Sequence, residues 1–159
     1  MVNIVLVNPK IPQNVGNIGR TCVALGATLH IILPIPFEIS DKQIKRAGLD
    51  YWPDLKLFIW DNLEHFYINH PFGQNHFFAT TKTKKLYFDF KFSDGNYFYF
   101  GSEDSGLPIE LMNKNPDNMF TLPMTKGTRS LNVANTVAIV GYEVLRQNIS
   151  DFKTRFSDG

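Results

Sequence analysis

Short apolar segments, each closed by a proline, a glycine or a polar turn, recur along this 159-residue chain and constrain its fold. Their length and β-rich composition suit strands that are buried on both faces. They are residues 2–7, 28–33, 55–60, 76–81, 96–101 and 119–122. Helical patterns alternate with them: one that follows Arg20 and ends near Gly26, a short polar helix from Asp41 to Gly48, one from Asp61 to about His70, and one from Ser130 to Asn148. The alternation predicts an α/β fold, with a mostly parallel sheet and helices on both faces.

The size and composition of the chain favour one domain over residues 1–159. Hydrophobic residues make up 43% of the sequence, and fourteen phenylalanines supply much of the surface that a core needs. We find no internal repeat, and no linker long enough to separate two domains. The tail after about residue 148 is polar, and we expect it to be loosely ordered.

Charge and cysteine content limit the possible partners and compartment. Sixteen basic residues against 15 acidic ones give a net charge of +1, so a nucleic acid would need a local basic face. The single Cys22 cannot form an internal disulfide, and its apolar helical setting favours buried packing over a reactive thiol. Without a signal peptide or an apolar run of membrane-spanning length, we expect a cytoplasmic protein with no membrane partner.

Three loops rich in glycine and small polar residues follow predicted strands: Asn14 to Arg20, Gly101 to Pro108, and Met124 to Asn132. In a parallel sheet, ligands bind beyond the carboxyl ends of the strands, so these loops are candidate site segments. The last loop enters the longest helical pattern, and Ser130 stands where a hydroxyl can cap the helix. An ordinary strand–loop–helix connection is an equal alternative for that stretch taken alone.

Several common sites lack support. The dinucleotide-binding G-x-G-x-x-G spacing, the Walker-type phosphate loop and the G-x-S-x-G elbow are all missing from the sequence. Four scattered histidines and one cysteine show no metal-ligand spacing, so we predict no metal site.

Three ordered motifs resemble those of the SPOUT superfamily of RNA methyltransferases. They are Asn14-x-Gly16-x-x-x-Arg20, Phe100-Gly101-Ser102-Glu103-x-x-Gly106-Leu107, and Leu122-Pro123-Met124 with Ser130-Leu131-Asn132-Val133. Within the superfamily, the chain is similar to the small enzymes that methylate the ribose 2′-hydroxyl of the tRNA wobble nucleotide. Residues 46–51, Thr80-Thr81-Lys82 and Tyr142-Glu143 support this narrower resemblance. Departures from the pattern are Ser102, where a proline is frequent, and Ala134 and Thr136 in the third motif.

The resemblance implies a deep trefoil knot at the carboxyl end and S-adenosylmethionine as the cofactor, with no metal. Carried over by position, the cofactor contacts are Ala79, Gly101, Leu122 and Ser130. It also implies a homodimer in which the first-motif loop of one subunit completes the site of the other. The expected substrate is a tRNA anticodon stem-loop with cytidine or uridine at the wobble position.

The resemblance also implies the catalytic residues: Arg20, Asn14, Glu103, Ser130 and Asn132. Arg20 is the family's usual candidate for the central role, either as the base or as a clamp on the neighbouring phosphate. A guanidinium holds its proton too tightly to be an easy base. Glu103 would orient Arg20 or a loop backbone, Asn14 would position the Arg20 loop or cap a helix, and Asn132 would brace the loops. Expected RNA contacts are Arg46, Lys82, Arg129 and Tyr142.

Three alternatives stay open from the sequence. The first is the same chemistry on ribosomal RNA or at another tRNA site. The second is a non-catalytic RNA-binding or ribosome-assembly factor on the same scaffold. The third is an α/β nucleotide-binding protein of unrelated chemistry.

Overall fold

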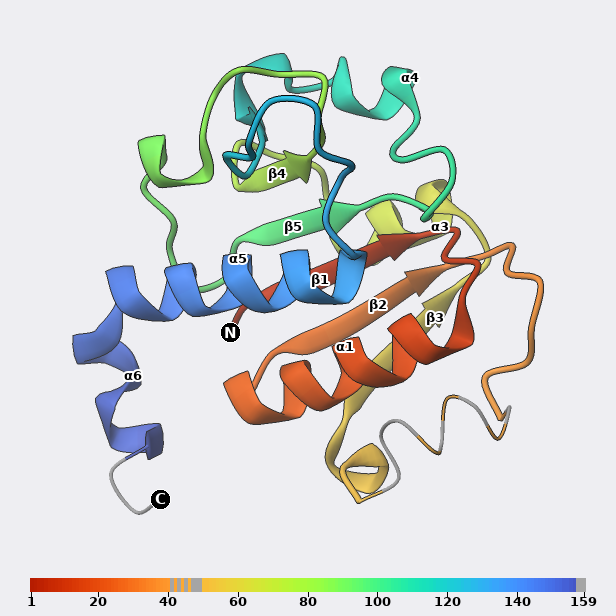
Figure 1. Ribbon diagram of the computed structural model, residues 1–159. Coiled ribbons are helices and arrows are strands. Elements are labelled where there is room, and N and C mark those ends of the chain that lie inside the picture. The colour runs from red at the N-terminus through yellow and green to blue at the C-terminus, as the bar shows by residue number, and fades with distance from the viewer. Residues whose placement is uncertain (41, 43, 45, 47–49, 157–159) are drawn as a thin grey trace.

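The computed structural model describes residues 1–40, 42, 44, 46 and 50–156, and its centre is a six-stranded parallel sheet (Figure 1). The order across the sheet is β3-β2-β1-β5-β4-β6, and every neighbouring pair runs parallel. The strands are β1 (Asn3–Val7), β2 (Thr28–Ile32), β3 (Lys56–Trp60), β4 (His76–Ala79), β5 (Tyr97–Phe100) and β6 (Met119–Phe120). Each lies within a predicted apolar segment, which confirms the predicted strands and their parallel pairing.

Helices cover both faces of the sheet, as predicted. One face carries α1 (Pro12–Leu25) and α5 (Val133–Gln147), which lie side by side in Figure 1. The other face carries α3 (Leu63–Asn69) and α4 (Ile109–Met112). Single 3-10 turns are η1 (Trp52–Asp54), η2 (Tyr87–Asp89) and η3 (Pro116–Asn118). The polar helix expected at Asp41–Gly48 falls mostly outside the described residues.

The ends of α1 follow from local sequence signals. Pro12 occupies the first turn, where a missing N–H leaves no hydrogen bond unmade. Gly26 ends the helix in the left-handed region at φ 65°, and the next amide, that of Ala27, donates to the Cys22 carbonyl at 2.8 Å. Cys22 is fully buried, which raises the pKa of its thiol to about 12.

On the face of the sheet that carries α1 and α5, these two helices approach closely at Gly141. A Cβ at this position would lie 2.4 Å from Leu25 Cδ1, so glycine lets α5 lie directly against α1. The amino-terminal ends of both helices therefore come to the same edge of the sheet, where β1 and β5 end.

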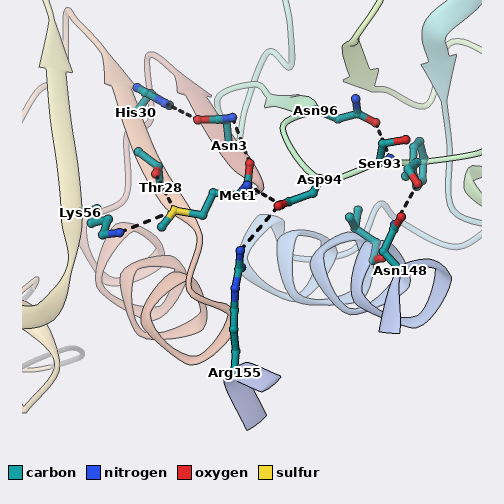
Figure 2. Close-up of polar contacts among 12 residues, drawn as sticks. Met1, Asn3, Thr28, His30, Lys56, Ser93, Asp94, Asn96, Asn148 and Arg155 are labelled. Carbon is teal, nitrogen blue, oxygen red and sulfur yellow. Dashed lines mark hydrogen bonds and ion pairs between the residues drawn. The ribbon is translucent and has the colours of Figure 1, made fainter. Parts of the chain in front are cut away.

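On the opposite face, histidines take part in an aromatic core. Trp60 Nε1 donates to His30 Nδ1 at 3.1 Å, so the ring's proton lies on Nε2, which donates to Asn3 Oδ1 at 3.1 Å (Figure 2). His76 Nδ1 lies 2.7 Å from the hydroxyl of Tyr99. Both histidines are fully buried, and burial lowers the pKa of His30 to about 3 and that of His76 to about 4.

The segment after Asn148, for which we expected loose order, instead forms α6 (Ile149–Phe156). Phe152 is buried in the core, and Arg155 forms an ion pair with Asp94 at 3.6 Å, in the loop before β5 (Figure 2). Ile149, Phe152 and Phe156 repeat at helical spacing, a pattern that the polar composition of the segment hides.

Candidate methyl-transfer site

Four loops meet at the carboxyl edge of the sheet around one cavity of about 460 Å³. They follow β1, β4, β5 and β6, and the start of α5 closes the remaining side. The strand order explains this convergence, because β1, β5, β4 and β6 are successive neighbours in the sheet. The lining residues are Ile11, Asn14, residues 79–82, 100–107, 120–122 and 130–133, Met124 and Thr136.

The loop after β5 is folded tightly on itself. The Gly106 amide donates to the Ser102 carbonyl at 2.9 Å, and Gly106 takes a left-handed conformation with φ 68°. A Cβ at residue 101 would lie 2.0 Å from the carbonyl carbon of Gly106, so only glycine fits at Gly101. This close backbone approach fixes the shape of the loop that lines the cavity.

Glu103 ties that loop to the start of α1. Its carboxylate accepts hydrogen bonds from the Lys10 amide at 2.9 Å, the Ile11 amide at 3.2 Å and Asn14 Nδ2 at 3.1 Å. These donors belong to the free amino-terminal end of a helix, where negative charge is also favoured by the helix dipole. Of the two roles that we considered for Glu103, the contacts match the orientation of loop backbone rather than of Arg20.

Asn14 and Asn132 extend the connection to α5. Because Asn14 Nδ2 donates to Glu103, its Oδ1 is left to accept, and it accepts from Asn132 Nδ2 at 3.0 Å. Asn132 Oδ1 in turn accepts from the amides of Ala134 at 2.8 Å and Asn135 at 3.3 Å. One carboxylate thus sets the orientation of two amide side chains, and the chain of bonds joins all three sequence motifs.

The prediction that Ser130 caps the last helix is wrong. The helix begins at Val133 and its N-cap is Asn132, which is also a favoured capping residue. Ser130 lies two residues earlier, exposed, in the wall of the cavity. Ser130 therefore lines the candidate site and is not the helix cap.

The four residues expected to contact the cofactor, Ala79, Gly101, Leu122 and Ser130, come from three loops and line the same cavity. Among the expected catalytic residues, Asn14, Glu103, Ser130 and Asn132 also line it. Arg20 does not. It is exposed on α1, where its guanidinium lies 4.9 Å from the centre of the Tyr51 ring and donates to the Tyr51 hydroxyl at 3.5 Å.

The expected RNA-contacting residues are spread more widely. Lys82 is exposed and lines the cavity, and Arg129 is exposed beside Ser130. Arg46 and Tyr142 are exposed as well, but neither lines the cavity. Of these four residues, only Lys82 lines the cavity within a single copy of the chain.

Sequence reasoning missed an ion pair beside the site. Lys10 Nζ lies 2.7 Å from Asp104 Oδ2, and the Asp104 carboxylate also accepts from the hydroxyls of Ser102 and Ser105. Hydrogen bonds from Lys10 and Ser102 hold the pKa of Asp104 well below its usual range. No spacing rule pairs residues 94 positions apart, although both belong to loops that the sequence places at one sheet edge.

Within the part of the chain that the structure describes, no group of three or more histidine, cysteine, aspartate or glutamate side chains could hold a metal ion. Among the same residues, no helix has the length and apolar character needed to cross a membrane.

Comparison with known proteins places this geometry in a family. Residues 1–142 match the SpoU rRNA Methylase family. A Bacillus subtilis protein, provisionally named a tRNA (cytidine(34)-2′-O)-methyltransferase, is 46% identical over 157 residues, 96% of this chain and 97% of that protein. A solved structure described as giving insights into 2-OH methylation of C/U34 on tRNA superposes with a TM-score of 0.87 at 37% identity, covering 94% of this chain and 97% of the other.

A more distant structure shares the fold. It is the SpoU methyltransferase AviRb from Streptomyces viridochromogenes in complex with the cofactor AdoMet, with a TM-score of 0.79 and 24% identity, covering 93% of this chain and 60% of the other. The family match spans most of the chain, and the cavity joins the three motifs that carried the resemblance. The chain belongs to the SpoU rRNA methylase family of RNA methyltransferases.

Proposed function

We propose that this protein transfers a methyl group from S-adenosylmethionine to the ribose 2′-hydroxyl of the wobble nucleotide, cytidine or uridine, in a tRNA anticodon loop. The observation that carries the proposal is the cavity in which Glu103, Asn14 and Asn132 join the three motif loops. Relatives of nearly the same length, 46% identical in one case, are named for this reaction.

The cavity fits the proposed cofactor. Its volume of about 460 Å³ is within the range of small-molecule sites. The half-exposed Ala79 leaves room for a ligand against the backbone, while Leu122 supplies an apolar wall. When bound, S-adenosylmethionine supplies a methyl group on a positively charged sulfur, a carbon already activated for displacement.

The protein's own contribution is to hold the acceptor oxygen in line with that carbon. Asn132, braced by Asn14 and Glu103, fixes the loop that carries Ser130 into the cavity. Ser130 presents a hydroxyl that can donate to or accept from a bound group. We assign Arg20 to the phosphate next to the reacting ribose, since a guanidinium binds phosphate through two parallel hydrogen bonds and keeps its proton.

We propose that the active unit is a homodimer in which Arg20 of one subunit completes the cavity of the other. Support comes from the position of Arg20, which is exposed on α1 and is not part of its own subunit's cavity lining. Large apolar side chains near α5 are also exposed: Leu131 by 44%, Ile139 by 37% and Tyr142 by 51%. Burial of such a surface between two copies would supply the driving force for association.

The proposed fold includes the trefoil knot of the SPOUT enzymes. The segment between β4 and β5 is bound twice by the carboxyl-terminal chain. Thr121, just after β6, donates from its amide to the Lys85 carbonyl at 2.8 Å. Gln147, at the end of α5, donates to the Phe90 carbonyl at 3.1 Å and accepts from the Phe92 amide at 2.7 Å. These bonds hold both ends of residues 122–146 to the segment between β4 and β5. A chain that is threaded past that segment would be held in this way.

We propose that RNA is held by the exposed cations Lys82, Arg129 and Arg46 and by the exposed ring of Tyr142, with Lys82 in the cavity lining itself. Neutralisation of several phosphates makes such binding sensitive to salt. An anticodon loop presents unstacked nucleotides, which is the form in which proteins usually read RNA sequence.

The test is mass spectrometry of tRNA nucleosides from cells with and without the gene. We expect 2′-O-methylcytidine or 2′-O-methyluridine at the wobble position to disappear with the gene and to return with the purified protein and S-adenosylmethionine. Loss of a ribose methyl group from ribosomal RNA or another tRNA site instead would redirect the assignment. A dimer that does not bind S-adenosylmethionine in calorimetry would contradict an enzymatic role altogether.

A further inference from the structure

A second groove, of about 630 Å³, adjoins the cavity at the carboxyl edge of the sheet. It lies above the ends of β2, β1 and β5, whereas the cavity lies above β1, β5, β4 and β6. Ser102 and Ser105 line both spaces, so only the loop after β5 separates them. The lining residues of the groove are Asn8, Lys10, Pro34, Ile35, Pro36, Ser102 and Ser105.

We propose that this groove binds the base of the nucleotide whose ribose is methylated. The inference rests on the proposed function, in which the cavity holds the methyl donor. A base is joined directly to its ribose, so a base site must begin where the cavity ends. The shared wall at Ser102 and Ser105 gives the groove that position.

The groove wall can accept the flat face of a base. Pro34 and Pro36 are exposed and Ile35 is half-buried, so three apolar side chains or rings present surface to a ligand. Ile35 also packs against the main core, which holds this wall in place. Stacking of a base on a rigid apolar surface depends little on which base it is.

Asn8 offers a polar contact that suits pyrimidines. Its Nδ2 donates to the carbonyls of Ile32 and Pro34, both at 3.3 Å, so its Oδ1 is left as the acceptor. No residue that the structure describes donates to this oxygen. Cytosine presents its exocyclic amine and uracil its ring N–H, so both can donate to it. Asn8 has φ 52°, a left-handed conformation that asparagine tolerates better than most residues.

Lys10 places a cation at the rim of the same groove. Its amide is held by Glu103, while its ammonium pairs with Asp104 at 2.7 Å. Both partners are exposed, with 46% and 61% of the side-chain surface accessible to solvent. An ion pair of this kind is weak, so a phosphate of the target nucleotide can take the place of Asp104.

An RNA that lacks only the target base tests this proposal. An anticodon stem-loop with an abasic ribonucleotide at the wobble position keeps the 2′-hydroxyl but has no base to fill the groove. The protein variants are Pro36→Asp, which removes the ring and adds a charge, and the milder Pro36→Ala. Pro71→Asp is the matched control, because Pro71 is exposed and lines neither space. Thermal unfolding and calorimetry with S-adenosylmethionine confirm that each variant is folded and binds the donor.

We expect the wild-type protein to lose about 10-fold in kcat/KM on the abasic RNA, within the cost of one lost stacking contact. Pro36→Asp should lose a similar factor on the normal RNA and change little on the abasic RNA, while Pro71→Asp should match the wild type on both. Equal losses for Pro36→Asp on the two RNAs would overturn the proposal. A third RNA carries the abasic nucleotide next to the wobble position. If the loss caused by Pro36→Asp disappeared on this RNA rather than on the RNA that lacks the target base, the proposal would be overturned too.

The wild-type protein, Pro36→Asp and Pro71→Asp are also compared on both RNAs by fluorescence anisotropy, which measures RNA affinity without methyl transfer. The affinities distinguish a failure of the proposed function from a failure of the base-site proposal. If the protein binds the stem-loop but methylates none of the RNAs, the proposed function fails, and the coupling in affinity still decides whether the base occupies the groove.

Discussion

The side chains of Asn14 and Asn132, 118 positions apart in the sequence, share a hydrogen bond of 3.0 Å at the edge of the cavity. The donor is Asn132, because Asn14 already donates to Glu103. The bond joins the first turn of α1 to the N-cap of α5, so the two helices that flank the cavity are fixed to each other at their amino-terminal ends. It also fixes the loop that carries Ser130.

Asn132→Asp tests this bond without removing the helix cap. Aspartate caps a helix as well as asparagine does, but it cannot donate to Asn14 Oδ1. Two acceptor oxygens would then face each other, and this should destabilise the binding conformation of the cavity by about 1–3 kcal/mol. The affinity for S-adenosylmethionine should fall by the corresponding factor, roughly 5-fold to 150-fold. Isothermal titration calorimetry measures the loss. Asn135→Asp, at an exposed position in the first turn of α5, is the control, and equal affinities for both variants would contradict the role of the bond.

Glu103→Gln tests the carboxylate on which this arrangement depends. Glu103 accepts three hydrogen bonds with its two oxygens, whereas glutamine has one acceptor oxygen and would direct an amide at one or more of the donors. We expect the free energy of unfolding to fall by about 1–3 kcal/mol. Urea denaturation measures this change. Glu110→Gln, an exposed residue of α4, should change it by less than about 0.5 kcal/mol.

Sequence patterns predicted most of the fold because its strands, apart from the exposed edge strand β3, are largely buried and therefore read as continuous apolar runs. The parallel pairing followed from the alternation of those runs with helices, and the three motifs then had to begin at one edge. Residues 14–20, predicted as a loop, instead belong to α1, which already begins at Pro12. The errors arose where one local signal had two readings. Ser130 and Asn132 are both good caps, and only the tertiary bond to Asn14 selects Asn132. In α6, three apolar residues lie among charged ones, and composition alone concealed them.

The details of the site could not be read from the sequence for a different reason. The Glu103 carboxylate contacts residues 89 to 93 positions away, and the groove lined by Asn8 and Pro34–Pro36 depends on how two adjacent loops turn. Pattern rules describe neighbours along one helix or strand, not contacts between loops of different strands. The residue types at Ala79 and Leu122 are ordinary core residues, and only the family resemblance drew attention to them.

The buried histidines predict how stability depends on pH. His30 and His76 have folded-state pKa values near 3 and 4, below the value of 6.5 expected in the unfolded chain, because burial disfavours the charged ring. Below pH 6.5 the unfolded chain therefore binds more protons than the folded one. The stability that the neutral rings contribute is complete above pH 6.5 and is lost as the pH falls toward 4 and 3.

We expect the free energy of unfolding to fall by up to about 1.4 kcal/mol per pH unit for each of the two histidines between pH 6 and pH 5. Urea denaturation at pH 7.5, 6 and 5 measures the slope. This interval lies above the ordinary pKa of aspartate and glutamate, so carboxylates contribute little to it. A flat profile from pH 7.5 to 5 would contradict the buried neutral state of both rings.

Mixed dimers test whether Arg20 acts in the cavity of its own subunit or of its partner. Arg20→Lys should lose most activity and keep cofactor binding, because lysine cannot form the two parallel bonds to a phosphate. Asn132→Asp should be defective in the cavity instead.

If Arg20 acts across the interface, a subunit with an intact cavity and a subunit with an intact Arg20 together rebuild one working site. An equal mixture, unfolded and refolded together, should then recover about a quarter of wild-type activity, since half of the random dimers are mixed and each holds one intact site of two. If Arg20 acts within its own subunit, no dimer in the mixture holds an intact site, and activity stays at the level of the two variants alone. Methyl transfer from radiolabelled S-adenosylmethionine to the anticodon stem-loop, measured with and without the refolding step, distinguishes these outcomes.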